Sequence, residues 1–176
     1  MTETINTLKS RRSYRNFTDK PVPRELVEQI VDAGLWAASG MGKQAPIILA
    51  VTNKELRDKL SGMNAGIMGK SADELDPFYG GPVVLVVLAD RSVPTYVYDG
   101  SLVLGNLMNA AESLGVGSIW IHRAKEEFDS EEGKAILAEL GVEGDYEGIG
   151  HCVLGYPAAP ANTPAARKDN RVFGAE

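Results

Sequence analysis

The sequence predicts an α+β fold, a sandwich in which helices cover one sheet, and three observations lead to this prediction. Segments with helical spacing come first, short apolar runs typical of buried strands follow, and long helical segments separate those runs. The chain has 176 residues, of which 44% are hydrophobic, enough for one sizeable core. No repeat or change of composition divides it before its Pro- and Ala-rich end. We therefore expect residues 1–176 to form one domain, with residues 157–176 as an extended C-terminal arm.

The first part of the chain is predicted to contain three helices and one strand. A short helix covers the first dozen residues and runs into the arginines of Arg11–Arg15, and a second follows Pro23, which suits a first helical turn. The apolar run 46–52 predicts a buried strand. Asn53 is then expected to cap a helix over 54–64.

The second part alternates strands and helices. Residues 70–82 carry prolines and glycines without any period and predict a surface loop or lid. Strands are predicted over 83–89, 115–121 and 148–156. The helix expected over 96–114 ends at Gly115 and is apolar on more than one face, which requires burial at the centre or against another subunit. Asp129 and Glu132 are expected to form a capping box for a helix over 133–140.

The gross composition excludes several classes of protein. A formal net charge of −6 argues against a general nucleic-acid or membrane-surface binder, since both need a broad positive field. The longest apolar run, residues 83–89, is far shorter than the roughly 20 residues of a membrane-spanning helix. Because the start of the chain lacks a signal-peptide pattern and Cys152 is the single cysteine, we expect a cytoplasmic protein without disulfides.

Metal and thiol chemistry have little support in the sequence. His122 and His151 are 29 positions apart and have no carboxylate or thiol at ligand spacing, so no metal site is predicted. Cys152 lies in a predicted strand, where an inert buried thiol is the expected state. The two G-x-G stretches complete neither a dinucleotide fingerprint nor a P-loop.

The basic residues of this acidic chain are unusually clustered. If Arg11 and Arg15 lie on one helix face, their like charges repel by roughly a few tenths of a kcal/mol, which an anion would offset. A charge-assisted hydrogen bond to phosphate contributes about 1.5 to 3 kcal/mol. The alternative is that these arginines only favour a helix C-terminus, worth about 0.3 to 1 kcal/mol, and face water.

Several stretches together resemble the FMN-dependent nitroreductase family, in its compact single-domain branch. The resemblance is carried by "SRRSYRNF" and the following helix, "SGMGKQAPIILAV", "DGSLVLGNLMNAAESLGVGSIWI", and "GIGHCVLGYP" followed by "ARKDNRV". They cover nearly the whole chain in the family's order. The resemblance implies a mostly antiparallel sheet covered by helices, in an intertwined homodimer with FMN at the subunit interface.

The resemblance also assigns cofactor-binding residues. It implies Arg11, Arg12 and Ser13 at the FMN phosphate, Arg15 near the flavin pyrimidine edge as an electrostatic aid, and Arg167 and Lys168 as tail cations that reach the phosphate. It implies Ser39, Met41 and Gln44 in a loop that reaches the flavin of the partner subunit. Finally, it implies Ile121, His122 and Arg123 at the flavin ring.

The chain departs from the family pattern on the open side of the cofactor. It has Gly42 where many members have Asn, Ala45 and Pro46 where many have Pro-Trp, and His122-Arg123 where glycine or glutamate is common. Phe78 and Tyr79 either cover the flavin ring or anchor their loop to the core.

The activity implied is that of an NAD(P)H oxidoreductase that passes hydride, by a ping-pong mechanism, to nitroaromatics, quinones or other electron-poor acceptors. No catalytic side chain is implied, because the chemistry belongs to FMN, and NADH or NADPH is the donor. Two alternatives stay open: a specialised flavin enzyme of the same superfamily, such as a reductive dehalogenase, and a non-catalytic FMN-binding module.

Overall fold

A four-stranded antiparallel sheet forms the centre of the fold in the computed structural model, which describes residues 1–175. The strands are β1 (Pro46–Val51), β2 (Val83–Asp90), β3 (Gly117–Ile121) and β4 (Tyr146–Gly155). Their order in the sheet is β1-β2-β4-β3, and every neighbouring pair is antiparallel. All four strands lie where the apolar runs predict them, which confirms the α+β fold class.

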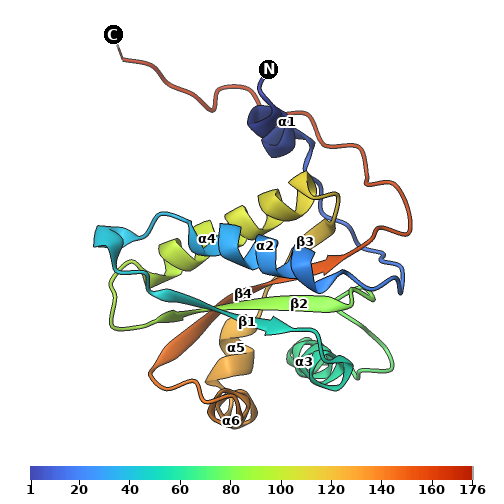
Figure 1. Cartoon of the computed structure of the whole chain (residues 1–176), viewed down its shortest axis with the longest axis vertical. Coiled ribbons are helices and arrows are strands. Elements are labelled where there is room, and N and C mark those ends of the chain that lie inside the picture. Colours follow the sequence, from blue (N-terminus) through green and yellow to red (C-terminus); the bar gives the residue numbers. More distant parts are fainter. Residues whose placement is uncertain (176) are drawn as a thin grey trace.

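Helices cover both faces of this sheet. They are α1 (Glu3–Ser10), α2 (Arg24–Leu35), α3 (Lys54–Ile67), α4 (Tyr96–Ser113), α5 (Ala124–Asp129) and α6 (Glu131–Glu139), with a short 3-10 turn, η1 (Gly40–Gly42). In Figure 1, α2 and α4 lie on one face, α3, α5 and α6 lie on the other, and α1 stands apart near both chain ends. Within residues 1–175, none of these helices combines the length and the apolar character needed to cross a bilayer.

The core consists of two apolar layers, one on each face of the sheet. Along β2, whose residues Val83–Ala89 are all buried, alternate side chains enter opposite layers. Leu85 and Val87 pack in the layer of α2 and α4, whereas Val84 and Val86 pack in the layer of α3, α5 and α6. An uninterrupted apolar run therefore forms a strand that is covered on both faces.

Two of the three helix ends predicted from the sequence are found in the structure, and the third is not. The Asn53 side chain accepts a hydrogen bond of 2.9 Å from the N–H of Leu56, and Gly115 follows α4 in the left-handed region (φ +71°), both as predicted. The prediction that Asp129 and Glu132 form a capping box is wrong. Ser130 caps α6 instead, accepting from the N–H of Gly133 at 3.0 Å, while Asp129 ends the preceding helix α5.

A bulge in β4 brings α5 against the sheet. Val87 pairs with Gly150 and Leu88 with Gly148, so Ile149 is the extra residue of the bulged strand. A Cβ at Gly148 would lie 2.1 Å from the carbonyl oxygen of Ala124, the first residue of α5. Glycine at this position therefore lets the start of α5, and the turn before it, approach the sheet closely.

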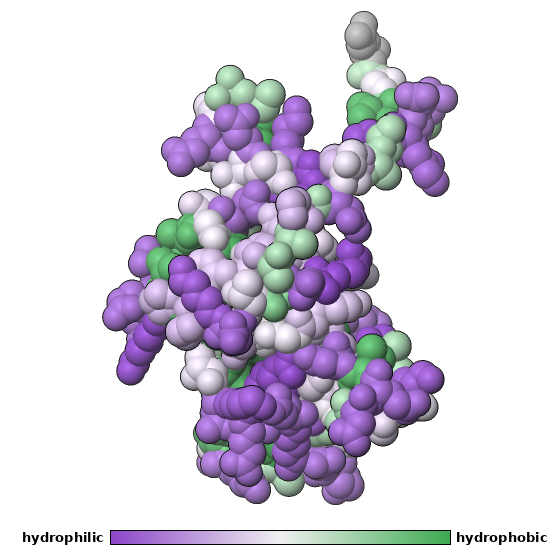
Figure 2. Space-filling model, turned by 90° about the vertical axis from the view of Figure 1, so that its right-hand side faces the viewer, coloured by the Kyte–Doolittle hydropathy of each residue, from purple (hydrophilic) through white to green (hydrophobic). Residues whose placement is uncertain are grey.

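The C-terminal arm follows β4 without regular secondary structure. Phe17 and Pro157 form an isolated bridge, and the Ala158 N–H donates to Asn16 at 3.1 Å, which ties the beginning of the arm to the N-terminal segment. The arm then passes α1 (Figure 1), and its end projects from the body as a separate lobe (Figure 2). Val172 and Phe173 are almost fully exposed there.

Candidate functional site

The arginine-rich segment after α1 is extended rather than helical. Helix α1 ends at Ser10, and Arg11 already has extended dihedral angles (φ −49°, ψ 132°). Ser13 forms a parallel bridge with Ser118 of β3, and the Tyr14 N–H donates to the Ser118 carbonyl at 3.2 Å. The prediction that Arg11 and Arg15 share one helix face is therefore wrong, because pairing with the edge strand β3 replaces the last helical turn.

Arg12 serves the helix that precedes it. Its Nη1 atom donates hydrogen bonds of 2.8 Å to the carbonyl oxygens of Lys9, Ser10 and Arg11, at the C-terminus of α1. These carbonyls have no partner within the helix, and a cation there also opposes the helix dipole. For Arg12, the structure thus supports the helix-end interpretation that the sequence left open.

The two ends of the chain meet at one cavity of about 650 Å³. Its walls come from α1, from the extended segment and from the C-terminal arm: Leu8, Lys9, Arg11, Arg12, Ser13, Pro164, Ala165, Ala166 and Arg167. Arg15 lines a smaller neighbouring cavity together with Ser13 and Asn162. Lys168, although predicted to reach the same place, is exposed and does not line the larger cavity.

The cations at this cavity have no acidic partners. Over residues 1–175, no carboxylate lies within 4.0 Å of the charged nitrogens of Arg11, Arg12 or Arg167, whereas Arg57 and Arg91 each have ion pairs. The Arg11 guanidinium has only a long contact of 4.0 Å with the sulfur of Met108. Within residues 1–175, no carboxylate lines the cavity. The polar residues of its lining are Lys9, three arginines and Ser13, a set that suits an anion with several oxygens, such as a phosphate group.

The predicted loop Ser39–Gln44 lies elsewhere on the chain and is held in an uncommon conformation. Met41 (φ 53°) and Gln44 (φ 50°) are left-handed, and Met41 is 81% exposed. The Gln44 N–H donates to the Ser39 hydroxyl oxygen at 3.1 Å. The Gly40 N–H donates to the carboxylate of Asp99 at 3.0 Å, in the first turn of α4. The structure does not bring this loop to the cavity of the same chain.

Asp99 belongs to this loop's surroundings, although no motif in the sequence indicates it. This carboxylate is buried, accepts from the Gly40 N–H and from the Thr95 hydroxyl (3.0 Å), and thereby joins the loop Ser39–Gln44 to α4. Its signal is an acidic residue on the inward face of a helix that is otherwise apolar.

The third predicted segment, Ile121–Arg123, is the turn between β3 and α5. Ile121 is buried, His122 is exposed and Arg123 is partly buried in the left-handed region (φ 79°). Only five non-glycine residues within 1–175 have positive φ, and three of them, Met41, Gln44 and Arg123, are predicted flavin contacts. Left-handed residues of this kind concentrate at binding sites, where surrounding contacts maintain them.

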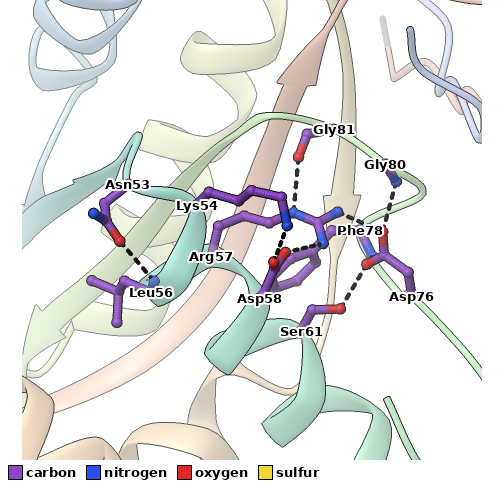
Figure 3. A network of polar contacts seen from close by, with 10 residues as sticks. All are labelled: Asn53, Lys54, Leu56, Arg57, Asp58, Ser61, Asp76, Phe78, Gly80 and Gly81. Atoms are coloured by element: carbon purple, nitrogen blue, oxygen red, sulfur yellow. Dashed lines mark hydrogen bonds and ion pairs between the residues drawn. The ribbon is translucent and has the colours of Figure 1, made fainter. Parts of the chain in front are cut away.

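The loop 70–82 is fastened to α3 at its second half (Figure 3). Asp76 accepts from the Arg57 guanidinium (2.5 Å), the Ser61 hydroxyl (2.6 Å), and the N–H groups of Phe78 and Gly80. Phe78 is fully buried in the layer of α3 and α5, so it anchors the loop and does not cover a flavin ring.

Comparison with known proteins gives one consistent family. The profile of the Nitroreductase family matches residues 8–156. A relative from Methanothermobacter thermautotrophicus is 31% identical over 123 residues, which are 67% of this chain and 60% of the relative. An FMN reductase [NAD(P)H] of Bacillus subtilis is 30% identical over 142 residues, 68% of this chain and 53% of the relative. The matched part is thus less than two thirds of either relative.

Among solved structures, this chain matches another protein over the full length of both. The crystal structure of a Bacteroides fragilis nitroreductase with bound FMN superposes with a TM-score of 0.90 at 27% identity, and covers 100% of both chains.

Proposed function

Since the chain belongs to the nitroreductase family, we propose that it is an FMN-dependent NAD(P)H oxidoreductase that acts as a homodimer. The Bacteroides fragilis nitroreductase binds FMN, and the Bacillus subtilis relative is an FMN reductase that uses NAD(P)H. The electron acceptors that we propose are nitroaromatics, quinones and similar electron-poor compounds. Each chain contributes one domain to the dimer.

The observation that carries this proposal is the cavity where unpaired cations from both chain ends meet. Although the chain has a net charge of −6, Arg11 and Arg167 have no acidic partner within residues 1–175, so both guanidinium groups are available to an anionic ligand. The phosphate of FMN has the required charge and several acceptor oxygens. The donor set present in the cavity therefore fits this end of the cofactor.

Each predicted segment then has one role toward FMN. Arg11, Ser13 and Arg167 hold the phosphate, with Arg12 securing the end of α1 and Lys168 adding positive charge nearby. Arg15 places a cation near the pyrimidine edge, where it favours negative charge on the ring. Ile121, His122 and Arg123 provide the ring contacts of the same chain.

The loop Ser39–Gln44 explains why we propose a dimer. It lies apart from the cavity, and the exposed Met41 projects from it, as a segment would that completes the cofactor site of a partner subunit. Two exposed apolar side chains add to this argument: Trp36 (81% exposed), which directly follows α2 and lies three residues before the loop, and Leu102 (51%) on α4.

FMN, when bound, supplies the hydride chemistry, and the protein supplies position and charge. The nicotinamide donor and the electron acceptor use one open binding place in turn, which gives ping-pong kinetics. Stacking space rather than specific hydrogen bonds governs acceptor choice, so we expect several acceptors to be used.

An anaerobic titration tests the proposal. Protein reconstituted with FMN is titrated with NADH and, separately, with NADPH while the visible absorbance of the oxidised flavin is followed. Bleaching by either nucleotide, and recovery of colour on addition of a nitroaromatic or quinone, are the expected results. A yellow protein that neither nucleotide bleaches would be a non-catalytic FMN-binding module, and a protein that retains no FMN would overturn the proposal.

A further inference from the structure

A buried polar cluster lies behind the turn Ile121–Arg123 and has no role in the site described above. It consists of Asn64 on α3, Glu127 on α5 and His151 on β4, whose exposed fractions are 0%, 1% and 0%. The ring of Phe78 packs against His151 with centroids 5.2 Å apart, so the surroundings are otherwise apolar. Polar groups buried in this way require hydrogen bonds to offset the loss of water.

Every member of the cluster is hydrogen-bonded. His151 Nε2 lies 2.9 Å from Glu127 Oε2, and His151 Nδ1 lies 3.2 Å from the carbonyl oxygen of Ile121. A carbonyl only accepts, so Nδ1 carries a proton, and a second proton lies between Nε2 and the carboxyl group. The pair therefore carries no net charge, which suits its burial.

Asn64 connects this pair to the turn. Its amide nitrogen donates to Glu127 Oε1 and to the carbonyl oxygen of His122 (2.9 Å), and its amide oxygen accepts from Nε of Arg123 (2.9 Å). All the acceptors face the nitrogen and the donor faces the oxygen, which fixes the amide orientation. The left-handed conformation of Arg123 is thus held by a side chain from a different helix.

The cluster determines the direction of two backbone N–H groups. The carbonyls of Ile121 and His122 both point into it, and the chain contains no cis peptide bond within residues 1–175. In a planar trans peptide the N–H points opposite to the C=O. The N–H groups of His122 and Arg123 therefore point away from the core. Within residues 1–175, neither N–H group donates a hydrogen bond to a side chain, and neither donates to a backbone carbonyl outside the strand pairing.

We propose that Asn64, Glu127 and His151 are positioning residues that hold the N–H groups of His122 and Arg123 as a preformed pair of donors for the flavin ring edge. This inference rests on the proposed function. Donors fixed in advance stabilise negative charge without reorganisation. They favour the electron-rich reduced ring over the oxidised ring, so the cluster raises the reduction potential of the bound flavin.

The test compares two alanine variants of α3. Asn64→Ala removes the amide that reaches the turn. Ser61→Ala, the matched control, removes a hydrogen bond made by another buried polar side chain of the same helix, but one directed to Asp76 in the loop 70–82. Asn64→Ser serves if Asn64→Ala does not fold, because the serine hydroxyl is too short to reach the His122 carbonyl.

Three measurements are made on each protein: the dissociation constant of FMN, the midpoint potential of the bound flavin, and the amide signals of His122 and Arg123 in ¹H–¹⁵N spectra of the flavin-free protein. We expect the Asn64 variant to bind FMN roughly tenfold more weakly. We expect a more negative potential, by about 30 mV for a tenfold change in the ratio of affinities for reduced and oxidised flavin. The two amide signals should shift and exchange faster with solvent. Ser61→Ala should leave all three close to wild type.

The outcomes separate the two proposals. Equal potentials and equal amide signals in Asn64→Ala, Ser61→Ala and wild type would overturn the positioning role while leaving the proposed function intact. A wild-type protein that does not bind FMN would overturn the proposed function and, with it, the role of the donors toward flavin.

Discussion

Nη2 of Arg57, on α3, lies 2.5 Å from Oδ2 of Asp76, in the loop that leads to the central strand β2. Arg57 also donates to the carbonyl oxygen of Gly81 at 3.1 Å (Figure 3) and is only about one tenth exposed. The irregular loop is thus fastened to a helix by a partly buried ion pair immediately before the strand begins. This arrangement makes Asp76 one source of the acid sensitivity of the fold.

The first prediction concerns stability at low pH. Burial raises the pKa of Asp76, but hydrogen bonds from Arg57, Ser61 and the Gly80 N–H outweigh it, so its pKa lies below the ordinary value of about 3.9. A carboxylate whose pKa is lower in the folded than in the unfolded protein stabilises the fold. This stabilisation is complete above the pKa of the unfolded protein and is lost as the pH falls through the pKa of the folded protein. We expect Asp76→Asn to reduce the free energy of unfolding by about 1 to 3 kcal/mol at neutral pH, after allowance for partial exposure.

The measurement is urea unfolding of the wild type and Asp76→Asn between about pH 6 and about pH 3. The difference between the two proteins should shrink toward acid pH. Asp73→Asn, in the exposed first half of the same loop, is the control and should follow the wild type. A constant difference at every pH would contradict the prediction.

The second prediction concerns the phosphate. Arg11→Ala should weaken FMN binding roughly 10- to 100-fold, the loss expected for a charge-assisted hydrogen bond, and should leave the binding of riboflavin, which lacks the phosphate, nearly unchanged. Arg24→Ala is the control, because Arg24 is exposed and pairs with Glu28 on α2. Flavin fluorescence titration measures all four combinations of variant and ligand. Equal losses for FMN and riboflavin would show that Arg11 acts through the fold and not through the phosphate.

The sheet could be predicted from the sequence because its signal is local. Apolar runs of five to ten residues between turn residues specify β1 to β4, and the spacing along Tyr96–Ser113 specifies α4. The convergence of the two chain ends could be predicted only through the family resemblance. Nothing in the spacing of Arg11 and Arg167 shows that they share a cavity.

Three features differ from the prediction or lie outside it: the N-cap of α6, the end of α1 and the buried polar cluster. Asp129 and Ser130 are both good N-caps, and the close contact of Gly133 with the backbone of Glu127 decides in favour of Ser130. Helix α1 ends at Ser10 because the next segment pairs with β3, and Arg12 then donates to the carbonyls left free at the helix end. The cluster of Asn64, Glu127 and His151 could not be predicted from the sequence, because each residue belongs to a different element and only the fold brings them together.

The third prediction concerns the single thiol. Cys152 is buried in β4, as the sequence predicts, and burial raises its pKa to about 12, although the charge of Arg11 acts in the opposite direction. The thiolate is the reactive form, so the native protein should react with a disulfide reagent at least 100-fold more slowly than the urea-unfolded protein at about pH 8, where an ordinary thiol with a pKa near 8.5 is partly ionised. Rapid reaction of the native protein, at a rate independent of its unfolding, would contradict this assignment.

The fourth prediction concerns the apolar side chains that α4 leaves uncovered. The helix buries Leu104 and Leu107 against the sheet, but Leu102 is 51% exposed in the isolated chain, which agrees with the excess of apolar residues in its sequence. If α4 packs against a second subunit, Leu102→Glu places a charge in that contact and should weaken the dimer at least about tenfold, while the monomer stays folded because the position faces outward. Sedimentation velocity across a range of concentrations measures this, with circular dichroism to check the fold. Ile67→Glu, which alters a similarly exposed side chain (42%) at the end of α3, is the matched control and should leave the dimer unchanged. A wild-type protein that sediments as a monomer at every concentration, or a dimer that both variants weaken equally, would show that this face of α4 is not the subunit contact.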